Sequence, residues 1–100
     1  MADLRVSAKA RRDLEQIGDA GATEYGAVAC ARYVDGFRRL FRLLQAQPLA
    51  GRQRPELGKG VRSLSHRPHA ILYRVIGDTV IIDRILHQAR DVGRALRADQ

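Results

Sequence analysis

Residues 61–91 read VRSLSHRPHAILYRVIGDTVIIDRILHQARD. In this segment the pair Gly77-Asp78 separates two runs that are rich in apolar and β-branched residues. Such a pair between two apolar runs is typical of the two-residue turn of a β-hairpin. We therefore predict one strand over residues 69–76 and a second, antiparallel strand over residues 79–87.

The turn sets which residues face each other across the two strands. In the expected register, Tyr73 pairs with Ile82 and Ile71 pairs with Arg84. Because strand side chains alternate between the two faces of a sheet, both faces of this hairpin carry mainly apolar residues. The expected N-terminal helices can cover only one face. We therefore expect apolar surface to remain on the other face, where a second polypeptide covers it.

One acidic and one basic side chain also lie on that second face. Arg74 and Asp83 sit diagonally across the two strands, within reach of each other. One interpretation is an ion pair inside the chain, and the other is a contact from Arg74 to a partner.

Before the hairpin, the sequence predicts a short strand and a pair of helices. Residues 3–6 form the strand, and Ser7 supplies the N-cap of the first helix. The run Gly18-Asp19-Ala20-Gly21 interrupts the helical pattern, so we place the turn of a helical hairpin there.

The second helix is expected over residues 23–46, with Thr23 as its cap and Pro48 just beyond its end. Its apolar residues recur at spacings of three and four, which places them on one face and makes them core candidates. They are Tyr25, Ala29, Tyr33, Phe37, Leu40, Phe41 and Leu44. A loop rich in glycine and proline over residues 49–60 then leads to a strand over residues 61–65.

Composition limits the classes of function. The 100 residues allow one domain, which we place at residues 1–100. Lys and Arg number 18 against 11 Asp and Glu, and the formal net charge of +7 favours an acidic partner: a protein, a nucleic acid or a complex of both. The single cysteine, Cys30, excludes an intrachain disulfide, and its apolar helical context predicts a buried thiol.

The N-terminal residues lack the apolar core of a signal peptide, and no apolar run is long enough to span a bilayer. We therefore expect a cytoplasmic protein without membrane contact. His66 and His69 flank Pro68, but a third metal ligand is lacking, so we expect no metal site and no cofactor.

Three motifs occur in order along the chain. The pattern S-x-x-A-x-x-D-L-x-x-I spans residues 7–17, and G-x-x-x-R-x-L with H-x-I-x-Y-R-V spans residues 58–75. The pattern R-I-L-H-x-x-x-D spans residues 84–91. Together they resemble the ParE-type toxins of the RelE/ParE toxin–antitoxin superfamily, over nearly the whole chain. Arg90 stands where many ParE-like sequences carry methionine.

The resemblance implies an α+β fold, with an N-terminal helical hairpin packed on a small, mainly antiparallel β-sheet of three to four strands. It also implies the toxin of a type II toxin–antitoxin module, which inhibits DNA gyrase by protein–protein binding and is not an enzyme. A cognate antitoxin would neutralise the toxin by folding an acidic segment onto its surface. Contact with DNA would be indirect, through the gyrase complex.

Under this interpretation, basic residues of the last strand and the C-terminal segment contact the target. These are Arg84, Arg90, Arg94 and Arg97. The antitoxin is expected to dock on residues that the predicted register places on one face. These are Leu72, Arg74, Ile81 and Ile85.

A RelE-like, ribosome-dependent mRNA endonuclease on the same fold is the alternative. Phosphodiester cleavage needs cations near the phosphate and a group that moves a proton. The candidates are Arg62, Arg74, Arg84 and His87, with Arg90 as a further cation. However, His87 belongs equally to the ParE-like motif, and no tyrosine follows Tyr73. A simple nucleic-acid-binding module is a third interpretation, which the lack of an expected exposed aromatic platform disfavours.

Overall fold

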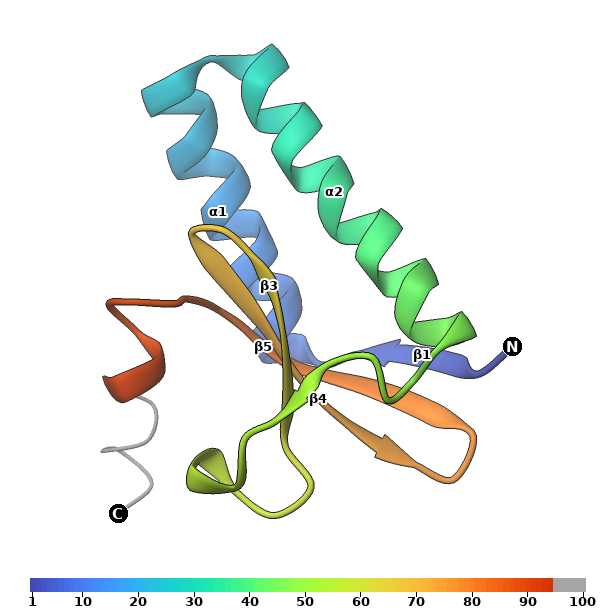
Figure 1. Ribbon diagram of the computed structural model, residues 1–100. Helices are drawn as coiled ribbons and strands as arrows, with labels where there is room; N and C mark the ends of the chain where they lie inside the picture. The colour runs from blue at the N-terminus through green and yellow to red at the C-terminus, as the bar shows by residue number, and fades with distance from the viewer. Residues whose placement is uncertain (95–100) are drawn as a thin grey trace.

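The computed structural model describes residues 1–94 (Figure 1). Its elements are β1 (Asp3–Val6), α1 (Ala8–Tyr25), α2 (Ala27–Ala46), β2 (Arg52–Gln53), the 3-10 helix η1 (Pro55–Leu57), β3 (Arg62–His66), β4 (His69–Ile76) and β5 (Thr79–His87). The strands form one sheet in the order β1-β5-β4-β3-β2. Neighbouring strands are antiparallel except β1 and β5, which are parallel.

This architecture confirms the predicted α+β fold and its mainly antiparallel sheet. The sheet has five strands, more than the three to four expected, because two residues of the predicted loop form β2 and pair with β3. Within residues 1–94, no helix combines the length and the apolar character that crossing a membrane requires.

Helix α1 begins as predicted and ends later than predicted. The Ser7 hydroxyl accepts a hydrogen bond from the Ala10 N–H at 3.0 Å, which is the expected N-cap. The predicted turn at residues 18–21 is wrong, because these residues stay helical and the hairpin turns at Gly26, whose φ of 88° favours glycine. Thr23 therefore lies inside α1, where its hydroxyl donates to Asp19 O, and does not cap α2.

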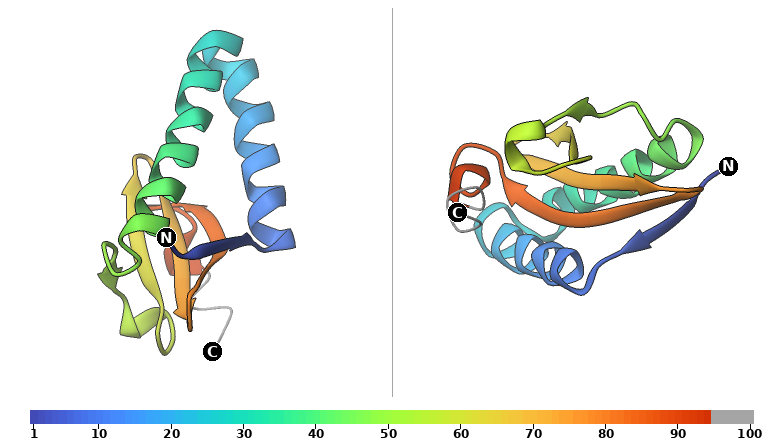
Figure 2. Two further views of the ribbon diagram at one scale, coloured as in Figure 1. Left: turned by 90° about the vertical axis from the view of Figure 1, so that its right-hand side faces the viewer. Right: turned by 90° about the horizontal axis from the view of Figure 1, so that it is seen from below.

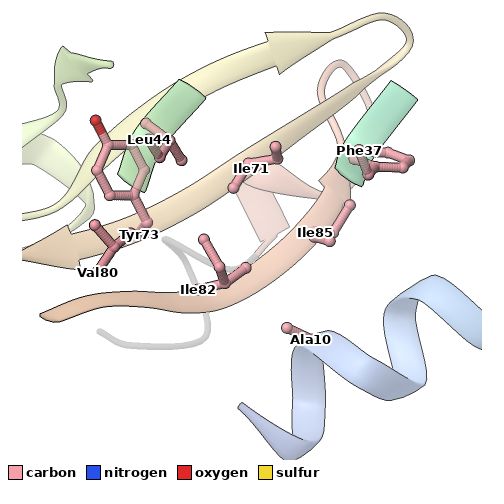
Figure 3. Close-up of a cluster of buried hydrophobic side chains, with 8 residues drawn as sticks. All are labelled: Ala10, Phe37, Leu44, Ile71, Tyr73, Val80, Ile82 and Ile85. Atoms are coloured by element: carbon pink, nitrogen blue, oxygen red, sulfur yellow. The ribbon is translucent and has the colours of Figure 1, made fainter. Parts of the chain in front are cut away.

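The main core lies between the helical hairpin and one face of the sheet (Figure 3). Side chains from both helices meet side chains from β4 and β5 there. They are Ala10, Phe37, Leu44, Ile71, Tyr73, Val80, Ile82 and Ile85. Most of the predicted helix stripe packs on this core, but Tyr25 is 69% exposed because it ends α1 at the tip of the hairpin, which projects beyond the sheet (Figure 2).

The β4–β5 hairpin turns at Gly77, with a φ of 58°, and the predicted pair Tyr73–Ile82 is confirmed. The predicted pair Ile71–Arg84 is wrong. The register shifts between Leu72 and Tyr73, so Arg84 pairs with Leu72 and Ile71 pairs with Ile85. A β-bulge inserts one extra residue and changes the face on which later side chains lie. Ile85 consequently joins the core on the helix side.

The second face of the sheet is partly covered by the chain itself. Leu72, Leu86 and Val92 form a smaller buried cluster, and Leu57 of η1 packs against it. Figure 2, viewed from below, shows α1 and η1 on opposite sides of β4 and β5. The expectation of a bare apolar face is therefore wrong at its centre. Among residues 1–94, Ile76 beside the turn is the large apolar residue of this face that is strongly exposed.

Candidate functional site

A cleft of about 1010 Å³ lies between the helical hairpin and the C-terminal end of β5. We call it the basic cleft. Its walls come from α1, α2, the turn between β3 and β4, and the segment that follows β5. Its charged and hydrogen-bonding side chains are Asp13, Gln16, Glu24, Tyr25, Cys30, Tyr33, Arg67, His69, Arg84, His87, Arg90, Asp91 and Arg94.

An ion pair between α1 and β5 lines this cleft. The Arg84 Nε and Nη2 atoms donate to the two carboxylate oxygens of Asp13, at 2.9 and 3.1 Å. Asp13 is only 9% exposed, and the hydrogen bond to it raises the pKa of Arg84. Such bidentate pairs are strong and directional. Arg84 is therefore engaged inside the chain, where the sequence predicted a contact to the target.

The same carboxylate completes the hydrogen bonding of β5. Strand β1 pairs with β5 only as far as Ile82. Beyond that point, the start of α1 takes the place of a strand: the Ser7 hydroxyl donates to Asp83 O at 2.8 Å, and the Ile85 N–H donates to Asp13 Oδ2 at 2.9 Å. Asp13 thus satisfies a buried backbone donor and a guanidinium together.

Tyr33 and His69 line the cleft near the β3–β4 turn and are joined by a hydrogen bond. The Tyr33 hydroxyl lies 2.6 Å from His66 O and 2.7 Å from His69 Nδ1. Burial raises the pKa of Tyr33 to about 12, so its hydroxyl keeps its proton. A carbonyl oxygen can only accept, so Tyr33 donates to His66 O, and His69 Nδ1–H must donate to Tyr33. Neutral His69 therefore has its lone pair on Nε2.

His87 has the opposite arrangement. Its Nδ1 accepts a hydrogen bond from the Arg90 N–H at 3.1 Å, so neutral His87 carries its proton on Nε2. The two rings are 5.7 Å apart and nearly perpendicular. Burial lowers the pKa of His69 below its ordinary value of 6.5, and the charges of His87 and Arg90 lower it further.

The arginines of the cleft differ in their partners. Arg90 lies 3.3 Å from the Asp91 carboxylate, and both side chains follow β5. In the described part of the chain, neither Arg67 nor Arg94 forms an ion pair. Arg97, the fourth predicted target contact, lies outside the described residues.

The structure separates the predicted antitoxin-docking residues. Ile85 is buried in the main core and Leu72 in the smaller cluster. The prediction that these two residues lie on the same face of the sheet is therefore wrong. Ile81 is partly exposed. Arg74 donates to both carboxylate oxygens of Asp83, at 2.7 and 3.0 Å, which confirms the predicted internal ion pair.

The residues proposed for a nuclease are also not assembled into one site. Arg84, His87 and Arg90 line the cleft, whereas Arg62 donates to the carbonyl oxygens of Leu49 and Gly51 and Arg74 pairs with Asp83. Among residues 1–94, no group of three or more His, Cys, Asp or Glu side chains is placed to hold a metal ion. Cys30 is buried, as predicted.

Sequence reasoning missed the contacts that build the cleft. Tyr33 was expected only as core, although it bridges the β3–β4 turn through His66 and His69. One signal was available: Asp13 and Arg84 are charged members of two separate motifs, and opposite charges at two such positions suggest a pair.

The comparisons with known proteins agree with one another. Residues 4–92 match the family model described as "ParE toxin of type II toxin-antitoxin system, parDE". The chain belongs to this family. It is 34% identical to Toxin ParE1 of Mycobacterium tuberculosis over 91% of this chain and 94% of that protein. It is 32% identical to Toxin ParE3 of Caulobacter vibrioides over 74% of each chain.

Solved structures extend the agreement from sequence to fold. A structure of the chromosomal ParDE system from P. aeruginosa matches this ParE-family chain with a TM-score of 0.76 and 29% identity, over 87% of this chain and 96% of the other. The toxin–antitoxin complex RelBE2 from Mycobacterium tuberculosis matches with a TM-score of 0.64 and 26% identity, over 86% and 96%. The basic cleft is thus built on a toxin fold.

Proposed function

We propose that this chain is a growth-inhibiting toxin that binds DNA gyrase, and that a cognate antitoxin protein neutralises it. The family match carries the proposal, because it includes the helical hairpin, the sheet and the start of the segment after β5. Gyrase binding is the activity that the resemblance to ParE-type toxins implies. The toxin acts by binding one conformational state of another enzyme, in the cytoplasm, and performs no chemistry itself.

The distribution of charge supports binding to an acidic partner. The net charge is +7, and Arg90 and Arg94 are exposed at one side of the basic cleft. Long-range attraction of this kind raises association rates and suits acidic protein surfaces. Because Asp13 occupies Arg84, we take Arg90 and Arg94 as the target contacts within residues 1–94.

The nuclease alternative has weaker support. A cation that stabilises the reacting phosphate must be free to contact it. Here Arg74 is held by Asp83, Arg84 by Asp13, and Arg62 by the Gly51 carbonyl oxygen at 2.8 Å. Three of the cations proposed for that chemistry therefore already have partners within the chain.

Expression in a bacterial host tests the proposal. Without antitoxin, cells should form filaments while protein synthesis continues, and coexpression of the small open reading frame next to the gene should restore growth. The Arg90→Ala/Arg94→Ala double variant should lose toxicity and keep its urea unfolding midpoint.

A matched control removes the same charge elsewhere. Arg38→Ala/Arg42→Ala changes two exposed arginines on α2, away from the cleft, and should stay toxic. An equal loss of toxicity in both double variants would show that only the net charge matters. Prompt arrest of translation, with mRNA cut at ribosomes, would support the nuclease and refute the proposal.

A further inference from the structure

The two histidines of the basic cleft present opposite chemistry to a ligand. Neutral His69 offers a lone pair on Nε2, and neutral His87 offers an N–H on Nε2, from rings 5.7 Å apart. Neither Nε2 atom has a hydrogen-bond partner within residues 1–94, and no buried side-chain nitrogen there lacks one. Both atoms are therefore accessible to solvent, and to a ligand that enters the cleft.

We infer that the basic cleft binds a carboxylate of an acidic segment of the partner protein between His69 and His87, and that a proton is taken up on His69 when the carboxylate binds. The inference rests on the proposed function, because it places the antitoxin in this cleft. Beyond the proposed function, the inference names a carboxylate as the group that the cleft recognises. It also predicts that the affinity for the partner depends on pH.

The proton is needed because a carboxylate has only acceptor atoms. One oxygen can accept from His87 Nε2–H, but the lone pair of neutral His69 faces an acceptor and repels it. A proton on His69 Nε2 turns this contact into a charge-assisted hydrogen bond. In the free chain, burial and the charge of Arg90 keep the pKa of His69 below 6.5, so His69 is neutral at pH 7 and can gain a proton on binding.

The charges around the two rings favour an anion. On the strands and the segment after them, Arg84 neutralises Asp13 of α1, and Arg90 neutralises Asp91. The groups that remain are Glu24 and Tyr25 of α1, Cys30 and Tyr33 of α2, His66 and Arg67 at the β3–β4 turn, and Arg94 after β5. Both phenols are neutral, since their pKa values are raised. Two arginines thus face one glutamate.

The walls favour a peptide over a nucleic acid. Ile17 and Leu86 line the cleft together with the small residues Ala20, Gly21 and Ala29, which allow a peptide backbone to approach closely. Nucleic acid would require a continuous track of free cations and aromatic platforms for its bases.

The test compares proton uptake with affinity in the complex. The partner is the purified protein encoded next to the toxin gene, and calorimetry in two buffers of different ionisation enthalpy measures the protons taken up. We expect net uptake near pH 7 and about threefold to tenfold tighter binding at pH 6.5 than at pH 7.5, since one proton per complex gives at most tenfold per pH unit. His69→Gln should remove both effects.

The matched control is a substitution of the remaining histidine of the chain, His66. His66 does not line the cleft, and its Nε2 contacts Tyr33 O at 2.8 Å, a bond that the amide of His66→Gln can replace. This variant should keep the pH dependence. A pH dependence that survives His69→Gln, or disappears in His66→Gln, would overturn the inference.

A second measurement does not need the partner. NMR titration of the imidazoles with N-acetylglutamate should raise the pKa of His69 and shift the signals of His87. If the neighbouring protein does not bind, the proposed antitoxin pairing fails, and the N-acetylglutamate titration still decides the carboxylate site. Unchanged histidine signals, or a short RNA oligonucleotide binding in the cleft instead, would overturn it.

Discussion

Replacing Asp13 by alanine should destabilise the chain more than any single change on its surface. The substitution removes the acceptor of two Arg84 hydrogen bonds and of the Ile85 N–H. Breaking one side of a buried ion pair costs about 3–5 kcal/mol. Because the Arg84 side chain is 37% exposed, water compensates part of its loss, so we expect the lower end, about 3 kcal/mol.

Such a loss is large against the roughly 5–15 kcal/mol that stabilises a typical domain. For a chain of this size it corresponds to a decrease in Tm of roughly 12–24 °C. Urea unfolding followed by circular dichroism measures the free energy directly. Asp13→Asn keeps an acceptor for the Ile85 N–H but loses the charge, so it should fall between the wild type and Asp13→Ala.

The control is an exposed pair on α2. Asp35 lies 3.8 Å from Arg39, with both side chains more than half exposed, and Asp35→Ala should change the free energy of unfolding by less than about 0.5 kcal/mol. If Asp13→Ala costs no more than Asp35→Ala, the reasoning about the junction of α1 and β5 is refuted.

Three further predictions concern the core and the cleft. Tyr73→Phe removes the hydroxyl that accepts from Gly51 N–H and donates to Pro48 O, and it should lower the free energy of unfolding by about 1–3 kcal/mol in urea; an unchanged midpoint would contradict this. Gly36→Ala should lower Tm, because the added Cβ would lie 2.6 Å from the His66 ring. Gly18 has open space around it, so Gly18→Ala should stabilise α1 by about 0.5–1 kcal/mol. A higher Tm for Gly36→Ala than for Gly18→Ala would refute the packing described. The folded state lowers the pKa of His69, so the unfolded chain binds more protons below pH 6.5. The free energy of unfolding should therefore fall as pH decreases through that value, and it should fall less steeply in His69→Gln. Equal dependence of the free energy on pH in the two proteins, measured by urea unfolding, would contradict the burial of that ring.

Local signals in the sequence predicted much of the fold. The Ser7 cap, the end of α2 before Pro48 and the turn at Gly77 each depend on a few adjacent residues, and all three are confirmed. The predicted turn at residues 18–21 was wrong because both of its glycines stay inside α1. Gly21 makes room for Cys30, whose Sγ would lie 2.8 Å from an added Cβ.

The register error has a tertiary cause. Counting outward from the turn assumes strict alternation, and nothing in the residues around Asp83 signals an extra residue. The bulge brings Ile85 into the core and its N–H to Asp13, which lies 72 positions away in the sequence. Contacts of that separation depend on packing and not on spacing.

The basic cleft depends on such long-range contacts throughout. His69 was noted in the sequence only as part of a motif and as an incomplete metal site, and Tyr33 only as a core residue. Their hydrogen bond joins positions 36 residues apart and determines which nitrogen of His69 faces a ligand. That information exists only once α2 and the β3–β4 turn lie side by side.

A supercoiling assay with purified gyrase tests the central proposal most directly. The purified chain, added to gyrase with relaxed plasmid DNA and ATP, should block supercoiling and accumulate cleaved DNA, and the protein encoded next to its gene should reverse both effects. Normal supercoiling at toxin concentrations that stop growth in cells would contradict the account.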